Sequence, residues 1–579
     1  MHSILPLLLS VGLSAAQESA FSPCPILGPR FPNPKSIATS TIVREALENL
    51  TKALDSYMDA GDGENGPVYP NTTSLSISLF STEMSNSSDT FLYEYHHTAT
   101  AEGNSTSEVI EAGPDTVYPI GDLTTLFTVY LFLKEAGEAY WNDPVTKFVP
   151  ELQEYATKGG KGKIAWDEIT LGDLAGNLGG IGGFTLHDDA LNQDLASFLD
   201  EQSVPSSVKS SSCTSGNSTC GRQDFLEYFG SIARPVYSPA NTPILSNSGF
   251  IILSFALETI TGKPFNDLLQ DSLLNELGLA NTTLSPPSQS NTKIPSFKAS
   301  GNVSHTSIDV EAPFNGLYST LTDVSKLVQS IMRSDHLSKA TTNRWLKPIA
   351  HTSNRANSIG RPWEIFSLPL TQQLISPMYQ VRGNKGLASS HIGIATDYNL
   401  GFAIVGADTE ANPDFNAWAD ILAREMVPAL EENALKEAAR KYAGTYRSVD
   451  AETDQEIQLT IARPTDSTPG LGVVAFNSST TDLFGVYAKM ASINRDALSM
   501  RLYPTDVDVG KGVDGLVMRA VLQDKSAFAD AGTPTCDTWR SVDRLQVNGL
   551  GMDEFKFVVG EGGTMRLDID ALGVKLVKE

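Results

Sequence analysis

The chain has 579 residues, more than one hydrophobic core usually covers, so we expect two domains. It carries 68 acidic and 42 basic side chains, which give a formal net charge of −26 and a pI near 4.7. Nucleic acids and anionic membranes are bound by clustered Lys and Arg, so this charge argues against both as partners. With an ordinary hydrophobic fraction of 41%, the sequence predicts a soluble acidic globular protein.

The N-terminus predicts a signal peptide over residues 1–16, because a short apolar run is followed by small residues before Gln17. The run is too short to span a bilayer, and the C-terminal K-L-V-K-E is no lipid-anchor tail. We therefore expect a secreted or secretory-pathway protein without a membrane anchor. Asn-x-Ser/Thr glycosylation acceptors, which suit that route, occur at Asn49, Asn71, Asn86, Asn104, Asn217, Asn281, Asn302 and Asn477.

The four cysteines have no Cys-x-x-Cys spacing, and no His-Glu-x-x-His motif occurs. His96 and His97 are adjacent on an expected strand and would point to opposite faces, so we predict no metal and no cofactor. Four cysteines allow three pairings. We favour Cys213 with Cys220, closing a Ser/Gly-rich loop, and Cys24 with Cys536, joining the mature N-terminus to the C-terminal domain.

Apolar periodicity predicts a helix over 40–58, ending near Gly61. Residues 74–79 alternate Ser with Leu or Ile, and residues 91–95 alternate aromatic with polar, so both are predicted to be antiparallel strands with one face in water. Two apolar runs around the turn at 397–399 predict a hairpin. Residues 414–440 predict a long helix, which Pro428 should kink.

From Tyr442 onward, seven short apolar runs separated by Gly, Pro and Asp predict a small β-barrel or sandwich. We place the boundary within residues 431–442, which gives domains at 17–435 and 436–579.

The stretch Tyr118 to Leu133 reads Y-P-I-G-D-L-T-T-L-F-T-V-Y-L-F-L, a helix apolar on every side that should be buried in a large core. Asp122 is an acceptable N-cap for this helix, and Gly137 an acceptable C-cap. The segment resembles the first motif of the serine beta-lactamase and penicillin-binding-protein superfamily, in the fungal class C-like branch that reads roughly Y-x-I-G-S-x-x-K-x-F-T. In that family a Ser-x-x-Lys pair supplies the nucleophile and its base. Here Asp122 stands at the Ser position and Thr125 at the Lys position.

The resemblance extends over nearly the whole mature chain. Residues 169–180 look like the family's T-L-x-x-L-A-x-H-x-S-G, with Asn177 where a His is usual. Residues 243–265 look like the segment that carries the Tyr-Ser-Asn motif, with Leu245 in place of Tyr, followed by Ser246 and Asn247. The Lys-(Ser/Thr/x)-Gly motif falls at Val381, Arg382 and Gly383, or after a register slip at Asn384, Lys385 and Gly386.

The resemblance implies an α+β fold, an antiparallel sheet sandwiched by helices, to which the C-terminal all-β domain is added. It implies hydrolysis or acyl transfer on esters, amides or lactams for relatives with an intact motif. In this chain the Ser, Lys and Tyr positions all carry other residues.

Asp122 and Arg382 are the candidate catalytic residues, and Thr125, Asn247 and Gly383 the candidate substrate contacts. Partial burial would raise the Asp122 pKa toward a general-acid or general-base range, whereas a facing Arg382 would lower that pKa and could hold a substrate carboxylate. The alternatives are that Asp122 is only a helix cap, Arg382 only its ion-pair partner, and Thr125 inert.

Three functions remain open. In the first, which we favour, the pocket processes a natural-product-like small molecule without a covalent serine adduct. In the second, the chain is a non-catalytic pseudoenzyme or ligand binder. In the third, it is a serine hydrolase or acyltransferase with another nucleophile.

Overall fold

The computed structural model describes residue 21 and residues 23–63, 66–83, 91–100, 111–157, 163–183, 220–285, 309–369, 375–408, 413–448, 456–464, 468–527 and 536–579. The described chain divides into two compact units. One holds the described residues from Asn33 to Asn433; the other joins those up to Pro32 to those from Ala434 onward. The N-terminal lead thus belongs with the C-terminal unit, whereas the sequence placed it in the first domain.

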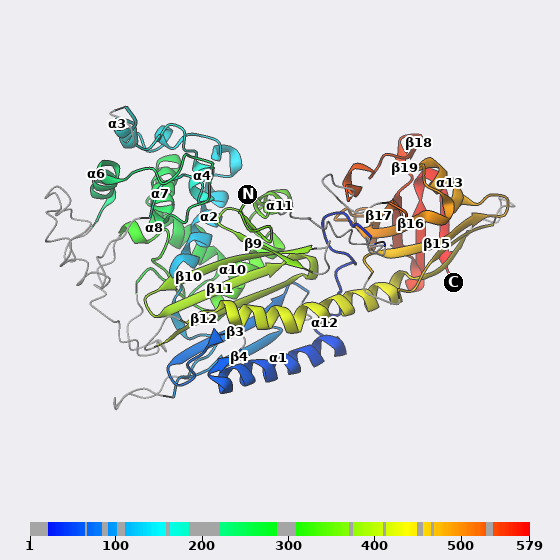
Figure 1. Ribbon diagram of the computed structural model, residues 1–579, viewed down its shortest axis with the longest axis horizontal. Helices are drawn as coiled ribbons and strands as arrows, with labels where there is room; N and C mark the ends of the chain where they lie inside the picture. The colour runs from blue at the N-terminus through cyan, green and yellow to red at the C-terminus, as the bar shows by residue number, and fades with distance from the viewer. Residues whose placement is uncertain are drawn as a thin grey trace, which may run out of the picture. The chain divides into compact units, whose positions relative to one another are not determined.

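The first unit is built on an antiparallel sheet (Figure 1). In the described residues eight strands follow the order β4-β3-β12-β11-β10-β9-β8-β7. Their bounds are β3 Thr73–Ser81, β4 Tyr93–His97, β7 Ala350–His351, β8 Asn357–Ile359, β9 Glu364–Pro369, β10 Ile375–Lys385, β11 Ala388–Ala395 and β12 Leu400–Asp408. The predicted hairpin is β11 and β12, joined by a 3-10 turn at Thr396–Tyr398.

Helices cover both faces of this sheet, which confirms the predicted sandwich. Figure 1 shows α1 (Thr41–Ala60) and α12 (Asn416–Tyr442) along one face, where they share a core with apolar side chains of β3 and β12. On the other face α10 (Leu321–Arg333) packs against β3, β11 and β12, and α2 (Thr124–Glu135) belongs to the same apolar core. The helix predicted at 40–58 is α1, with Ser40 as its N-cap and Gly61 after its last turn. Pro428 lies inside α12, where the sequence placed it.

The predicted water-facing side of β3 is wrong, because its alternating serines are buried. Ser78 Oγ lies 2.9 Å from Ser325 Oγ of α10, and Ser76 Oγ 2.9 Å from His96 Nδ1. Small hydroxyl side chains that hydrogen-bond across the interface let the helix approach the sheet closely. His96 and His97 bond different partners, and no cluster of metal-ligating side chains occurs in the described part of the chain.

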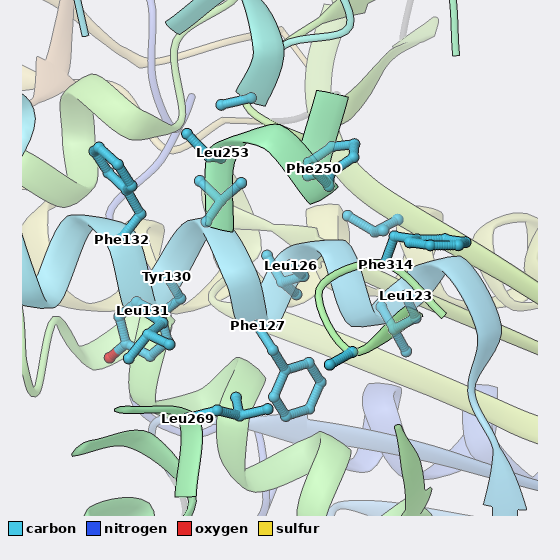
Figure 2. Packing of buried hydrophobic residues seen from close by; sticks show 14 of the residues in the cluster. Leu123, Leu126, Phe127, Tyr130, Leu131, Phe132, Phe250, Leu253, Leu269 and Phe314 are labelled. Atoms are coloured by element: carbon cyan, nitrogen blue, oxygen red, sulfur yellow. The ribbon is translucent and has the colours of Figure 1, made fainter. Parts of the chain in front are cut away.

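Further helices surround the buried helix α2. They are α3 Glu151–Thr157, α4 Leu171–Ala175, α6 Arg222–Ile232, α7 Asn247–Thr261, α8 Phe265–Leu268, a π-helical segment Leu269–Leu274, α9 Asn275–Leu277 and α11 Lys339–Trp345. Figure 2 shows side chains of α2 packed against Phe250 and Leu253 of α7 and against Leu269. Residues 124–133 are all buried, as an all-apolar helix requires, and Gly137 follows the helix with a positive φ.

The second unit is a closed antiparallel barrel, which confirms the predicted all-β domain. Its strands are β13 Gly444–Ser448, β14 Ile457–Ile461, β15 Leu471–Ser478, β16 Leu498–Pro504, β17 Gly515–Asp524, β20 Glu554–Val559, β21 Met565–Ile569 and β22 Val574–Lys578. The first seven correspond to the seven predicted runs, while β22, which closes the barrel between β21 and β13, was not predicted. The unit also holds α13 Leu483–Met490 and a small hairpin, β18 Gln546–Val547 with β19 Leu550–Gly551.

The Cys24–Cys536 disulfide forms within the barrel unit, as predicted. Cys220 is disulfide-bonded, and Cys213 lies outside the described residues. Of the glycosylation acceptors, Asn49, Asn71, Asn281 and Asn477 are exposed. Asn86, Asn104, Asn217 and Asn302 lie outside the described residues, as does the predicted signal peptide. No helix in the described ranges is long and apolar enough to cross a membrane.

Candidate functional site

Asp122 lies in a tight turn at the entrance to α2. A short strand, β5 (Val117–Pro119), pairs with β6 (Tyr318–Thr320) and leads into the 3-10 turn η1 (Gly121–Leu123). Gly121 has φ +57°, in the region that glycine enters without strain. A Cβ at Gly121 would lie 2.5 Å from the backbone of Asn384 on β10. The turn and the strand can therefore approach backbone to backbone only because residue 121 lacks a side chain.

Gly383 permits the same approach from the side of the strand. A Cβ there would lie 2.1 Å from the Ile120 backbone oxygen and 2.5 Å from the Leu123 nitrogen. Ser390 of β11 donates its hydroxyl to the same Ile120 oxygen at 2.7 Å. Gly383 thus serves close packing between the strand and the turn, and its predicted role as a substrate contact stays a prediction. Gly383 faces the turn, whereas a Cβ at Gly386 would meet no atom within 4 Å, which favours Val381, Arg382 and Gly383 as the motif position.

The carboxylate of Asp122 accepts hydrogen bonds from two backbone N–H groups, those of Asn384 and of Asp122 itself. It is not the N-cap of α2, which begins at Thr124 without a side-chain cap. The Thr125 hydroxyl donates to the Asp122 backbone oxygen at 2.7 Å and so closes the first turn of the helix. Asp122 is therefore held by the strand opposite rather than by its own helix.

Burial raises the pKa of Asp122 to about 6, as partial burial was expected to do. The two N–H groups and the nearby charge of Lys385 act in the opposite direction without cancelling the effect of burial. Lys385 is itself largely enclosed: its Nζ donates to the Asn315 backbone oxygen at 2.7 Å and lies 3.9 Å from Glu311. Burial lowers the pKa of Lys385. Asp122 therefore exchanges a proton in the range where acid–base catalysts work.

The expected pair of Arg382 with Asp122 does not form. The Arg382 guanidinium binds both carboxylate oxygens of Glu364 and donates to Asn416 Oδ1 at 3.1 Å. Register explains this, because Glu364 is paired with Gln380, two residues before Arg382 on β10. With its charge engaged by Glu364, Arg382 does not pull the Asp122 pKa down.

Asp122 and Arg382 nevertheless line one cleft of about 520 Å³. The other lining residues are Thr125, Asn177, Pro243, Leu245, Asn247, Phe250, Thr352, Asn357, Ser358, Ile359, Pro362, Glu364, Ile365, Phe366, Gln380, Val381, His391, Asn416, Ala419 and Asp420. Among them, buried His391 has a pKa lowered to about 3 by burial and by Arg382, so its imidazole is neutral. The volume suits a small organic molecule.

Two amides form the wall of the cleft near Asp122. Asn177 has φ +57°, and its Oδ1 accepts the Ser246 N–H at 3.1 Å. Asn247 starts α7, and its Oδ1 accepts the Ser248 N–H at 2.9 Å. The Asn177 contact thus joins two segments that line the cleft, whereas the Asn247 contact stays within the start of α7, and Asn247 remains a candidate substrate contact. Leu245, beside them, is 76% exposed and gives this rim an apolar tip.

Sequence reasoning missed Glu364 as the Arg382 partner and the Asn384 N–H as the group that holds Asp122. The first follows from strand pairing, because β9 begins at Glu364 and lies beside β10. The second is a backbone group and has no side-chain signature.

Comparison with known proteins agrees with this architecture. The family model described as beta-lactamase matches residues 91–425, and that described as Beta-lactamase-like-like, C-terminal domain, matches residues 434–579. The chain belongs to the beta-lactamase family. It is 27% identical to a "Beta-lactamase-like protein" of Arthroderma benhamiae, over 93% of this chain and 92% of the relative. It is 25% identical to "Probable hydrolase M10" of Phoma sp., over 84% of this chain and 77% of the relative. A class C beta-lactamase mutant of known structure matches with a TM-score of 0.47 at 13% identity, over 68% of this chain and 99% of that chain.

The raised Asp122 pKa predicts a pH-dependent loss of stability. Between the unfolded-state pKa of 3.8 and the folded-state value of about 6, the folded chain binds more protons than the unfolded chain. The free energy of unfolding therefore falls as pH rises through this window, by up to about 3 kcal/mol. Asp122→Asn has no such proton and keeps an oxygen for the N–H donors.

Urea unfolding of both proteins at about pH 3.5 and about pH 7.5 checks this. The stability of Asp122→Asn relative to wild type should rise by up to about 3 kcal/mol between the two pH values. A difference that stays constant with pH would contradict the raised pKa.

Proposed function

We propose that this beta-lactamase-family protein is a hydrolase-like enzyme that processes a small molecule by proton transfer at Asp122, without a covalent serine adduct. The observation that carries the proposal is a cleft-lining carboxyl group with a pKa of about 6. Such a group is present in both protonation states near neutral pH, so it can remove a proton from a substrate and return it. Cyclisation, isomerisation and elimination all need this chemistry.

The residues around Asp122 favour this route over acyl transfer. The Thr125 hydroxyl is engaged with the Asp122 backbone oxygen, and Val381 is an apolar residue on the face of β10 that carries Gly383. Lys385, whose charge acts on Asp122, is bonded to Asn315 and has its own carboxylate neighbour, Glu311. A serine nucleophile needs a hydroxyl with a base in reach, and these side chains do not offer the pair beside Asp122.

We also propose the secretory route for this chain. The Cys24–Cys536 disulfide is of a kind that persists in oxidising compartments, and the four described glycosylation acceptors are exposed. Both observations support the signal peptide expected from the sequence.

Loss of the carboxyl group should stop turnover. A strain of the producing organism that lacks this protein should accumulate an intermediate, which wild-type protein clears on complementation. Asp122→Asn should leave the intermediate uncleared, because the amide cannot exchange the proton, while its melting temperature stays close to that of wild type. The matched control is Asp420→Asn, which removes another carboxylate of the cleft lining and should restore clearance.

Clearance by Asp122→Asn would refute the proton-transfer role. A strain without the protein and with an unchanged metabolite profile would favour the ligand-binding alternative.

One observation favours a serine hydrolase as the second candidate. Ser358 lines the cleft, and its Oγ lies 3.2 Å from His351 Nδ1 on the neighbouring strand. A Ser–His contact is the minimum unit of an activated nucleophile. His351 is exposed, however, and no donor for an oxyanion lies in the described contacts of this pair.

A fluorophosphonate probe separates the two candidates. We expect the purified protein to stay unlabelled, because a half-exposed hydroxyl with a solvated histidine is a weak nucleophile. Stoichiometric labelling that Ser358→Ala abolishes, and that Ser56→Ala on the exposed side of α1 does not, would establish the serine route instead.

A further inference from the structure

Three large apolar side chains are exposed on the segment that joins α6 to α7. Leu245 lines the cleft and is 76% exposed, while Val236 and Tyr237 are 50% and 48% exposed. Among the described residues of this unit, the other exposed large apolar side chains are Tyr69 and Ile375. Apolar side chains that gather beside a cleft are typical of a surface that binds a ligand.

Main-chain hydrogen bonds hold this segment to the loop that follows α4. The N–H groups of Val236 and Tyr237 donate to the Gly180 oxygen at 2.9 and 3.2 Å, and the Ile244 N–H donates to the Asn177 oxygen at 2.7 Å. Gly180 has φ +66°, and a Cβ there would lie 2.3 Å from the Tyr237 oxygen, so glycine is required at this contact. The exposed side chains are therefore held in place before a ligand arrives, which lowers the cost of binding.

Val236 lies close to the wall of the cleft. A Cβ at Gly182 would lie 3.4 Å from Val236 Cγ2, and a Cβ at Gly183 would lie 3.2 Å from Oδ1 of the cleft-lining Asn247. Because consecutive Cα atoms are about 3.8 Å apart, Val236 Cγ2 and Asn247 Oδ1 lie within roughly 14 Å of each other. A medium-length alkyl chain spans that distance, so one ligand can contact both the cleft and Val236.

The cleft continues the apolar surface inward. Pro243 and Phe250 line it from the same part of the chain as Leu245, and Asp122 supplies a polar group in the same lining. A ligand that fits this arrangement has two parts, a polar group for Asp122 and an apolar arm for Leu245.

We propose that Leu245 and Val236 form a subsite for an apolar arm of the substrate, which is a small amphiphilic molecule with a polar reacting group and an alkyl or aryl arm. The subsite rests on the proposed function in one respect, because that function brings the reacting group to Asp122. A short arm contacts Leu245, which lines the cleft, and only a longer arm reaches Val236. Each added methylene group that leaves water strengthens binding.

The test measures how binding depends on the length of the arm. The probes are 2-butanone, 2-hexanone, 2-octanone and 2-decanone, which share a polar carbonyl head and differ in an unreactive alkyl arm. Their dissociation constants are measured by NMR, from broadening of the acetyl methyl proton signal. For the wild-type protein we expect the affinity to rise roughly two- to fourfold with each added methylene group.

Three variants locate the subsite. Leu245→Ser changes an exposed side chain, so the fold should persist, and it should flatten the length dependence while leaving 2-butanone binding unchanged. Val236→Thr, which keeps the side-chain shape, should weaken binding of the longest ketone alone. The matched control is Leu27→Ser in the barrel unit, where the leucine is 72% exposed, and it should bind the whole series like wild type.

A wild-type affinity that does not change with arm length would overturn the proposal, and so would an unchanged length dependence in Leu245→Ser. An equal loss for every probe, 2-butanone included, would assign the effect to the whole cleft and also contradict it. A wild-type dimer in sedimentation that Leu245→Ser converts to a monomer would assign the surface to a second copy instead. Should Leu245→Ser fail to fold, Val236→Thr decides with 2-decanone.

The apolar subsite and the proton-transfer role can fail independently. Asp122→Asn keeps Leu245 and Val236, so its length dependence should match that of wild type whether or not it clears the accumulated intermediate. A length dependence lost in folded Asp122→Asn would contradict the separate apolar subsite.

Discussion

The site depends on one close approach between two backbones. The turn η1 and strand β10 touch through Gly121 and Gly383. A Cβ added at either glycine would lie within 2.5 Å of the opposite backbone. This contact brings the Asn384 N–H to the Asp122 carboxylate. It also fixes Gly383 toward the turn. Packing of α2 among apolar side chains holds the turn from behind (Figure 2).

The division of charges across β10 decides the chemistry. Arg382 is engaged by Glu364 and Asn416 on one side of the strand, so its positive charge does not neutralise Asp122. Lys385 lies near Asp122 but is enclosed with Glu311. Burial therefore dominates at Asp122 and keeps its pKa near 6. A direct Arg382–Asp122 pair would have held the carboxyl ionised at neutral pH and removed its value as a proton donor.

Much of the fold follows from the sequence because burial leaves a periodic signal. The all-apolar stretch of α2, the helical spacing and caps of α1, and the short strands of the barrel were each predictable. The serines of β3 were not, since their alternation is typical of a water-facing strand. Their burial is favourable because of partners such as Ser325 of α10 for Ser78 and His96 of β4 for Ser76.

The candidate site was predictable in its members but not in its contacts. Asp122, Thr125, Asn247 and Arg382 do line one cleft. Their partners depend on strand register and on backbone groups, as with Glu364 beside Arg382 and the Asn384 N–H beside Asp122. Neither kind of contact can be deduced from the identity of the side chain alone.

Burial in this cleft, together with two backbone N–H donors, sets the proton affinity of Asp122. The most direct measurement is a pH titration of the Asp122 carboxyl carbon by carbon-13 NMR, with Asp122→Asn used to assign the signal. We expect a midpoint at about 6. A midpoint near the ordinary value for aspartate, about 3.9, would contradict it.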